Sequence, residues 1–291
     1  MSCHSIRSGC AESPQPPSPP PSPSPSPTAS HNFDAPEADV ILRSSDGEDF
    51  RAHQDFLKFS PPRFRHILGL PRHAELPHKL PIIDIAETSG VLRPFLQYLY
   101  PEPPPWIADL SMWEALYTMA EKYDAEAITA PLKDMLIPRF LDTSPVHVYA
   151  LASHWAFEEE AKIASRGTLR MDILTELSQA DAELMGHHAK EQLLLLHAQR
   201  RNTALSLIAS SWSFSGAESC GCRPVGYEAV FGKLVKRLST RPWFTVEELF
   251  EETAWVDAPY VCGGCCRNSL KDINAWFSWF LKKMSELPQT V

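Results

Sequence analysis

The sequence predicts an α+β fold in which a small sheet is followed by helices, with helix in excess. Three short strands are expected between residues 38 and 85, of which the first and third are apolar runs, and the turn Ser45-Asp46-Gly47 separates the first two. From Thr88 onward, apolar residues recur instead at the helical spacing of three and four. The chain has 291 residues and is 44% hydrophobic, which is enough for one or two domains with a substantial core.

Residues 1–35 are predicted to form a disordered tail. From Pro14 to Pro27 the chain is nearly all proline and serine. Proline donates no backbone hydrogen bond, and without large apolar residues nothing offsets the entropy of ordering, so we expect a tail that leans toward polyproline II. Besides a solvated leader, the stretch suggests a Pro-x-x-P ligand or phosphorylation at its Ser-Pro sites, which are Ser18, Ser22, Ser24 and Ser26.

Residues 36–142 are predicted to form the first folded domain. Val40-Ile41-Leu42 is its first strand, and a second strand ends at His53. A helical pattern follows, whose apolar positions are Phe56, Leu57, Phe64, Ile67 and Leu68. Leu80 to Ile85 is an apolar run of strand length, and Pro81 suits its first position, where a missing N–H is tolerated.

Three helices are expected in the rest of this domain. Thr88 should cap the first, which has Pro94 near its first turn and the apolar positions Val91, Leu92, Phe95, Leu96, Leu99 and Tyr100. Ser111–Tyr123 and Ala125–Phe140 are the other two patterns. Pro131 and Pro138 are expected to shorten or kink the last one. We expect Leu57, Phe64, Phe95 and Leu99 to be core residues.

The stretch from Ala38 to Leu68 resembles the start of a BTB/POZ domain. The hallmark of that family is an Asp that opens a strand, followed by F-x-A-H-x-x-x-L-x-x-x-S-x-x-F. This chain matches it at Asp39, Phe50, His53, Leu57, Ser60 and Phe64. The resemblance implies a protein-interaction module in which the His is a buried residue that ties strand to helix. In several dimeric members the Asp lies in a charged pocket at the dimer seam.

Two departures from the family pattern concern dimerisation. A basic residue often follows the family's His, whereas this chain has Gln54 there, so the carboxylate of Asp39 would need other hydrogen bonds. In addition, the Pro/Ser tail stands where some dimers exchange an apolar strand. The resemblance still implies a homodimer through apolar helix surfaces as one possibility.

Many members of this family are substrate adaptors for cullin-type ubiquitin ligases, often through a hydrophobic-x-Glu element. The nearest stretch here is His73-Ala74-Glu75, which lacks the apolar residue. A cullin partner is therefore one hypothesis among several.

Residues 143–291 are predicted to form a helical extension. Ser144-Pro145 and Phe157 to Ala161 begin two helices, and residues 181–210 form one long helix or two. Further helical patterns are Tyr227–Leu238, Val246–Glu252 and Asp272–Met284, the last with Ile273, Trp276, Phe277, Phe280 and Leu281 on its apolar side. The layout of this extension, cysteines included, resembles fungal BTB proteins of the basidiomycete type.

Four cysteines of the extension suggest a structural zinc site as an alternative focus. Cys220, Cys222, Cys262 and Cys265 could supply four thiolates to one tetrahedral zinc ion. Free thiols and a redox-sensitive disulfide are the other interpretations. Glu183, His187 and Glu191 are spaced to share a helix face that could bind a metal, although such faces are more often solvated.

Composition and the lack of certain motifs disfavour nucleic-acid binding, membrane insertion and several enzyme classes. Lys and Arg number 27 against 36 Asp and Glu, and a net charge of −9 disfavours direct binding to nucleic acid. No apolar run could span a membrane and no secretory signal is visible, so we expect a cytoplasmic or nuclear protein. No phosphate-binding loop, dinucleotide fingerprint or hydrolase motif occurs.

The sequence therefore predicts a non-enzymatic protein-interaction protein without a cofactor, which associates with itself or docks a partner as an adaptor or scaffold. The alternative is a zinc-stabilised regulator of transcription or chromatin that works through its cysteine-containing region.

Overall fold

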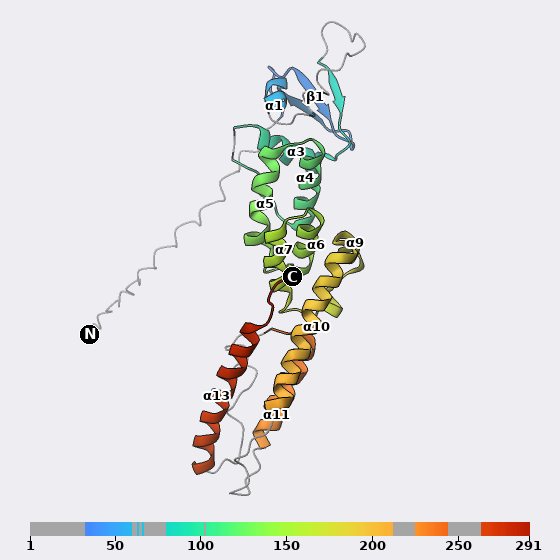
Figure 1. The fold of residues 1–291 in the computed structure, drawn as a ribbon. Helices are drawn as coiled ribbons and strands as arrows, with labels where there is room; N and C mark the ends of the chain where they lie inside the picture. Colours follow the sequence, from blue (N-terminus) through green and yellow to red (C-terminus); the bar gives the residue numbers. More distant parts are fainter. Residues whose placement is uncertain are drawn as a thin grey trace, which may run out of the picture.

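The computed structural model describes residues 33–59, 63, 66, 80–101, 103–211, 225–243 and 263–291. These residues form a small three-stranded mixed sheet near the N-terminus and a larger helical part, so the α+β prediction is confirmed at this level (Figure 1). The N-terminal elements are β1 (Val40–Arg43), β2 (Asp49–Ala52), α1 (Gln54–Phe59), β3 (Ile82–Asp84), α3 (Ser89–Leu99), α4 (Leu110–Lys122) and α5 (Glu126–Phe140). They are followed by α6 (Pro145–His154), α7 (Glu158–Thr168), α8 (Ile173–Glu176), α9 (Gln179–Leu184), α10 (Gly186–Ser211), α11 (Val225–Thr240) and α13 (Gly263–Glu286).

The sheet has the strand order β2-β1-β3. β1 pairs with β2 antiparallel, with Leu42 opposite Phe50, and with β3 parallel, with Leu42 opposite Ile83. Because successive side chains of a strand point to opposite faces, this register gathers the buried side chains on one face, namely Val40, Leu42, Phe50, Ala52 and Ile83. This inner face belongs to the main hydrophobic core.

Helices α3 to α7 complete that core and form the body on which the sheet lies (Figure 1). Trp113 of α4 is buried, and its Nε1 donates a hydrogen bond to the carbonyl oxygen of Leu132 in α5 at 2.7 Å. The predicted core positions Leu57, Phe95 and Leu99 are buried, whereas Phe64 lies outside the described residues.

The prolines of this body behave differently from the prediction. Pro94 is the sixth residue of α3, farther into the helix than its first turn, where it is buried. α5 also continues through Pro131 and Pro138 as one helix of 15 residues, so the predicted shortening does not occur. Packing of Ile128, Leu132, Leu136 and Phe140 into the core offsets the hydrogen bonds that the prolines cannot donate.

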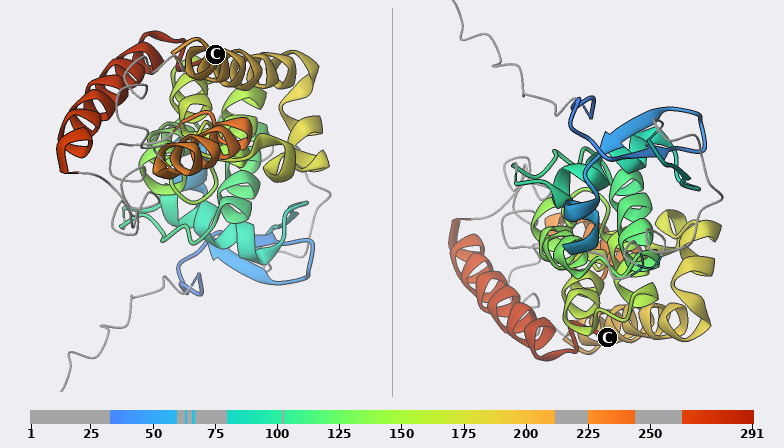
Figure 2. Two further views of the ribbon diagram at one scale, coloured as in Figure 1. Left: turned by 90° about the horizontal axis from the view of Figure 1, so that it is seen from below. Right: turned by 90° about the horizontal axis from the view of Figure 1, so that it is seen from above.

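The C-terminal helices extend the molecule away from the sheet (Figures 1 and 2). Residues 181–210 are divided between two helices, because Gly186 adopts a φ of +76° between α9 and α10. The N-terminal half of α10 contributes Leu193 to the main core. Its C-terminal half contributes Ala204 and Ile208 to a second cluster with Leu234 and Leu238 of α11 and Phe277, Phe280 and Met284 of α13.

A buried arginine joins these C-terminal helices. The guanidinium of Arg200 donates hydrogen bonds to the carbonyl oxygens of Met284, Leu287, Pro288 and Pro242, and it lies 5.1 Å from the ring centroid of Trp243. Burial, with Arg166 nearby, lowers the pKa of Arg200 to about 10, so the group is still charged at neutral pH. A cation at the end of α13 also complements the helix dipole.

Within the described ranges, no helix is both long enough and apolar enough to cross a membrane. Val246–Glu252, which the sequence predicts to be helical, lies outside those ranges.

Candidate interaction surface

The predicted signature residues meet where β2 passes into α1. Phe50 and Leu57 are buried in the main core, and Asp39 and His53 lie on either side of the strand-to-helix junction. Ser60 and Phe64 lie outside the described residues, as does the stretch His73-Ala74-Glu75.

Asp39 holds the first turn of α1. Its Oδ1 accepts a hydrogen bond from the backbone nitrogen of Gln54 at 2.7 Å, and the Gln54 side-chain amide donates to the Asp39 carbonyl oxygen at 3.3 Å. The carboxylate is exposed to solvent. Gln54, which stands where the family often has a basic residue, thus supplies hydrogen bonds instead of charge, and within one chain Asp39 needs no cation.

His53 ties this junction to the end of α3. The hydroxyl of Tyr100 lies 3.0 Å from the backbone nitrogen of His53 and 3.1 Å from its Nδ1. The ring of Phe56 packs on the same tyrosine with centroids 4.5 Å apart, and Phe33 meets it edge-on at 5.5 Å. The sequence indicated Tyr100 only as an apolar helix position, although a tyrosine there, unlike a phenylalanine, offers a hydroxyl.

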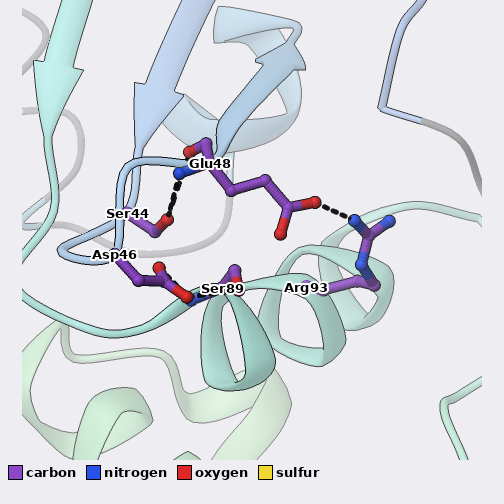
Figure 3. A network of polar contacts seen from close by, with 5 residues as sticks. All are labelled: Ser44, Asp46, Glu48, Ser89 and Arg93. Carbon is purple, nitrogen blue, oxygen red and sulfur yellow. Dashed lines mark hydrogen bonds and ion pairs between the residues drawn. The ribbon is translucent and has the colours of Figure 1, made fainter.

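The β1–β2 turn is bound to the start of α3 through Asp46 (Figure 3). Its carboxylate accepts hydrogen bonds from the backbone nitrogen of Ser89 at 2.8 Å and from the Ser89 hydroxyl at 2.6 Å. Hydrogen bonds from Ser44 and Ser89 lower the pKa of Asp46 to about 2. Thr88 occupies the N-cap position but makes no side-chain capping bond, so the predicted cap is replaced by a residue distant in sequence.

Two neighbours reinforce this turn. The Ser44 hydroxyl donates to the carbonyl oxygen of Glu48 at 3.1 Å and accepts from its backbone nitrogen at 3.0 Å. The Glu48 carboxylate pairs with Arg93 on the next turns of α3 (Figure 3). The sheet and α3 are therefore joined by polar contacts at the turn as well as by the core.

The other face of the sheet is directed away from the core, and we call it the outer sheet face. The register aligns its side chains in two rows, Arg51–Ile41–Ile82 and Asp49–Arg43–Asp84. Arg43 binds both carboxylate oxygens of Asp49, at 2.7 and 2.9 Å, which lowers the pKa of Asp49. Beside this ion pair, the side chain of Ile82 is 39% exposed on β3, at one edge of the sheet.

The outer sheet face thus combines one exposed isoleucine, Ile82, with a fixed ion pair and a strand edge. Of the N–H and C=O groups of an edge strand, half point away from the sheet, and an added strand of another chain can pair with them. An arrangement of this kind can bind protein.

A polar cluster farther along the chain has residue types that also occur in hydrolases. His147 of α6 pairs through Nδ1 with Asp181 of α9, and the Ser178 hydroxyl donates to the same carboxylate at 2.6 Å. The serine hydrogen therefore goes to the carboxylate and not to the imidazole, which is the reverse of an activated nucleophile. Ser178 also accepts from the Asp181 backbone nitrogen at 3.0 Å, which caps α9.

The predicted metal ligands are placed as follows. Cys220, Cys222 and Cys262 lie outside the described residues, and Cys265 lies in α13 without a described side chain. Zinc binding there stays a prediction.

The prediction that Glu183, His187 and Glu191 share one helix face is wrong. Gly186, which has a positive φ, begins α10 after the end of α9, and the Glu183 carboxylate instead accepts a hydrogen bond from the side chain of Gln179 at 2.8 Å. Among the side chains that are described, no three His, Cys, Asp or Glu form a group suited to a metal.

Comparison of the chain with protein-family models finds no matching family, and comparison with curated proteins finds no similar sequence.

Proposed function

We propose that this chain is a non-enzymatic protein-interaction protein whose N-terminal α+β domain is of the BTB/POZ type. The observation that carries the proposal is the strand-to-helix junction. Asp39, Phe50, His53 and Leu57, which match the family pattern in sequence, belong to one contact set that joins the sheet, α1 and the end of α3. The hydroxyl of Tyr100 joins His53 to the end of α3, which supports the strand-to-helix role that the family resemblance implies for this His.

In this proposal the domain associates with itself or docks a partner through the outer sheet face, and the helical extension offers a second surface. Adaptor and scaffold are the two forms that this activity takes. The exposed Ile82, next to a charged row that sets orientation, suits a protein partner better than a small molecule.

The test compares three forms of the full-length chain: wild type, Ile82→Lys and Val235→Lys. Ile82 and Val235 are both branched aliphatic residues, 39% and 38% exposed, on β3 and α11. Circular dichroism should show that both variants fold. Light scattering after size exclusion measures self-association, and affinity purification with mass spectrometry identifies partners from an extract of the native cells.

We expect Ile82→Lys to abolish self-association or the recovery of a specific partner, while Val235→Lys retains it. Recovery of a cullin with ubiquitin machinery would make the protein an adaptor, and recovery of only the chain itself or of signalling proteins would make it a scaffold. A monomer that recovers no partner, or binding that both variants retain equally, contradicts the proposal.

A further inference from the structure

The connection between α3 and α4 presents an unusually exposed tryptophan. Trp106 is 81% exposed, more than any other large hydrophobic residue in the part of the chain that the structure describes. The guanidinium carbon of Arg139, on α5, lies 3.6 Å from the centroid of its ring. A cation stacked this closely holds the indole in one orientation, although it leaves most of the ring open to solvent.

The surrounding chain fixes this pair in place. Prolines at 101, 103, 104 and 105 restrict the backbone before Trp106. The next residue, Ile107, is buried in the main core, and Asp109 caps α4 by accepting from the backbone nitrogen of Met112 at 2.8 Å. An aromatic residue on a rigid support loses little entropy when it binds, which is the property of an interaction hot spot.

The guanidinium of Arg139 has N–H groups that make no hydrogen bond to the described residues. Its guanidinium lies over Trp106 and near Phe140, and none of the carboxylates described in the structure pairs with it. The hydroxyl of Tyr98 is nearby, since Arg139 opposes the increase in the pKa of that tyrosine caused by burial. Among the described residues, the site therefore combines an open aromatic surface with guanidinium N–H donors that no carboxylate engages.

This chemistry fits a polyproline II segment. Such a helix presents proline rings, which pack against aromatic surfaces, and backbone carbonyls that have no internal donor. A ligand without charge would meet no repulsion from Arg139. The chain itself contains a proline-rich sequence, because Pro14 to Pro27 consists of proline, serine and one glutamine.

The connecting chain is short enough for the segment Pro14–Pro27 to reach Trp106 within one molecule. Phe33, the first described residue, packs against Tyr100 with ring centroids 5.5 Å apart. Trp106 follows Tyr100 by six positions in the sequence, and Phe33 follows Pro27 by six positions. Each interval spans at most about 20 Å at roughly 3.3–3.6 Å per residue. A linker of this length gives a segment an effective concentration on the order of millimolar at its target.

We propose that Trp106 and Arg139 form a binding site for proline-rich sequence and that its occupant is the segment Pro14–Pro27 of the same chain.

The experiment uses the full-length chain labelled with 5-fluorotryptophan and observed by fluorine NMR. Trp106→Phe identifies the signal of Trp106, and Trp279, which is 38% exposed on α13, provides a reference signal far from the site in sequence. The comparison form, called the tail variant, has every proline from Pro14 to Pro27 replaced by alanine. A synthetic peptide with the sequence of residues 14–27 serves as the added ligand.

We expect the tail variant to shift the Trp106 signal and to leave that of Trp279 unchanged. Added peptide should then restore the wild-type position in the tail variant. In the wild-type chain the peptide should bind about tenfold more weakly, as for a site that is about nine-tenths occupied. Arg139→Met in the tail variant should weaken peptide binding, because it removes the guanidinium donors, while its fluorine spectrum otherwise shows a folded protein.

Three results would overturn the proposal. A Trp106 signal that responds neither to the tail variant nor to the peptide means that no proline-rich ligand binds. Equal peptide affinity in both forms means that the site accepts such segments but that the chain's own tail does not occupy it. A wild-type Trp106 signal that moves on tenfold dilution means that the occupant is the tail of a second copy.

Discussion

The hydroxyl oxygen of Tyr100 serves both the backbone nitrogen and the Nδ1 of His53, at 3.0 and 3.1 Å. One side chain from the end of α3 thereby holds the residue at which β2 turns into α1. The contact explains why a histidine suits this place, since its ring nitrogen and its backbone N–H meet the same partner.

Tyr100→Phe tests this contact. The variant should lower the free energy of unfolding by about 1–2 kcal/mol, because a part-buried N–H loses its acceptor while the ring packing remains. Chemical denaturation measures the effect. Tyr98→Phe is the matched control, since the buried Tyr98 hydroxyl has no hydrogen-bond partner among the described residues and its removal should cost nothing. Equal losses in the two variants would show that the hydroxyl of Tyr100 contributes no stability.

Asp46→Asn tests the link between the β1–β2 turn and α3. The side chain keeps its shape but loses the charge that faces the N-terminus of the helix, so the melting temperature should fall by about 2–4 °C at pH 7. The folded pKa of about 2 lies below the ordinary value of 3.8. The stabilisation from the charge is therefore complete above pH 4 and is lost as pH falls toward 2. The difference between wild type and variant should shrink over that window, and a constant difference would contradict the prediction.

His197 should make stability fall in mild acid. Its Nε2 is 3.0 Å from the Thr168 hydroxyl, which already donates to the Ser165 carbonyl oxygen at 2.6 Å, so Nε2 must carry the proton. Burial, with Arg200 next in effect, lowers the pKa of His197 to about 4 from its ordinary 6.5. Between those values the unfolded chain binds a proton that the folded chain does not.

The free energy of unfolding should consequently drop by about 3 kcal/mol from pH 7 to pH 4 on account of this residue. His197→Gln keeps a side-chain N–H donor and cannot ionise, so this part of the pH dependence should disappear, as measured by denaturation at each pH. His188→Gln is the control at an exposed histidine of the same helix. If the two variants retain the same slope as wild type, His197 does not cause the acid sensitivity.

Arg200→Met should destabilise the C-terminal helices by about 2–4 kcal/mol, because the carbonyl oxygens that end α13 lose the cation they share. Amide hydrogen exchange should increase mainly in α11 and α13. Arg201→Met, at the half-exposed next position of α10, should leave exchange unchanged. Uniform exchange throughout the chain in Arg200→Met would instead mean that the arginine supports the whole fold.

The sequence predicts the local elements well where one periodicity dominates. Ser111–Tyr123 and Ala125–Phe140 differ from α4 and α5 by one residue or less at each end, because their apolar residues recur at helical spacing. The strands are likewise found, since alternation and turn residues coincide at Ser45-Asp46-Gly47. Asp39 and His53 were recognised by family pattern alone, and their hydrogen-bond partners needed the structure.

What the sequence could not predict are contacts between residues that are distant along the chain. Asp46 caps α3 from 43 residues away, and Arg200 reaches a carbonyl oxygen 88 residues later. Local rules pointed to Thr88 for the first role and gave no reason to single out one arginine of a polar helix for the second. The exposed Trp106 was also missed, because exposure of an aromatic residue in a proline-rich loop depends on how that loop lies against α5.

The length of α10 has a consequence for geometry. A helix of 26 residues is about 39 Å long at 1.5 Å per residue, and its two halves are anchored in different hydrophobic clusters. The helix therefore keeps these two clusters at a fixed distance from each other, since an α-helix resists both stretching and compression. A molecule bound to the C-terminal helices would therefore be kept at a separation from the main helical body that is set by the length of one helix and not by a flexible linker.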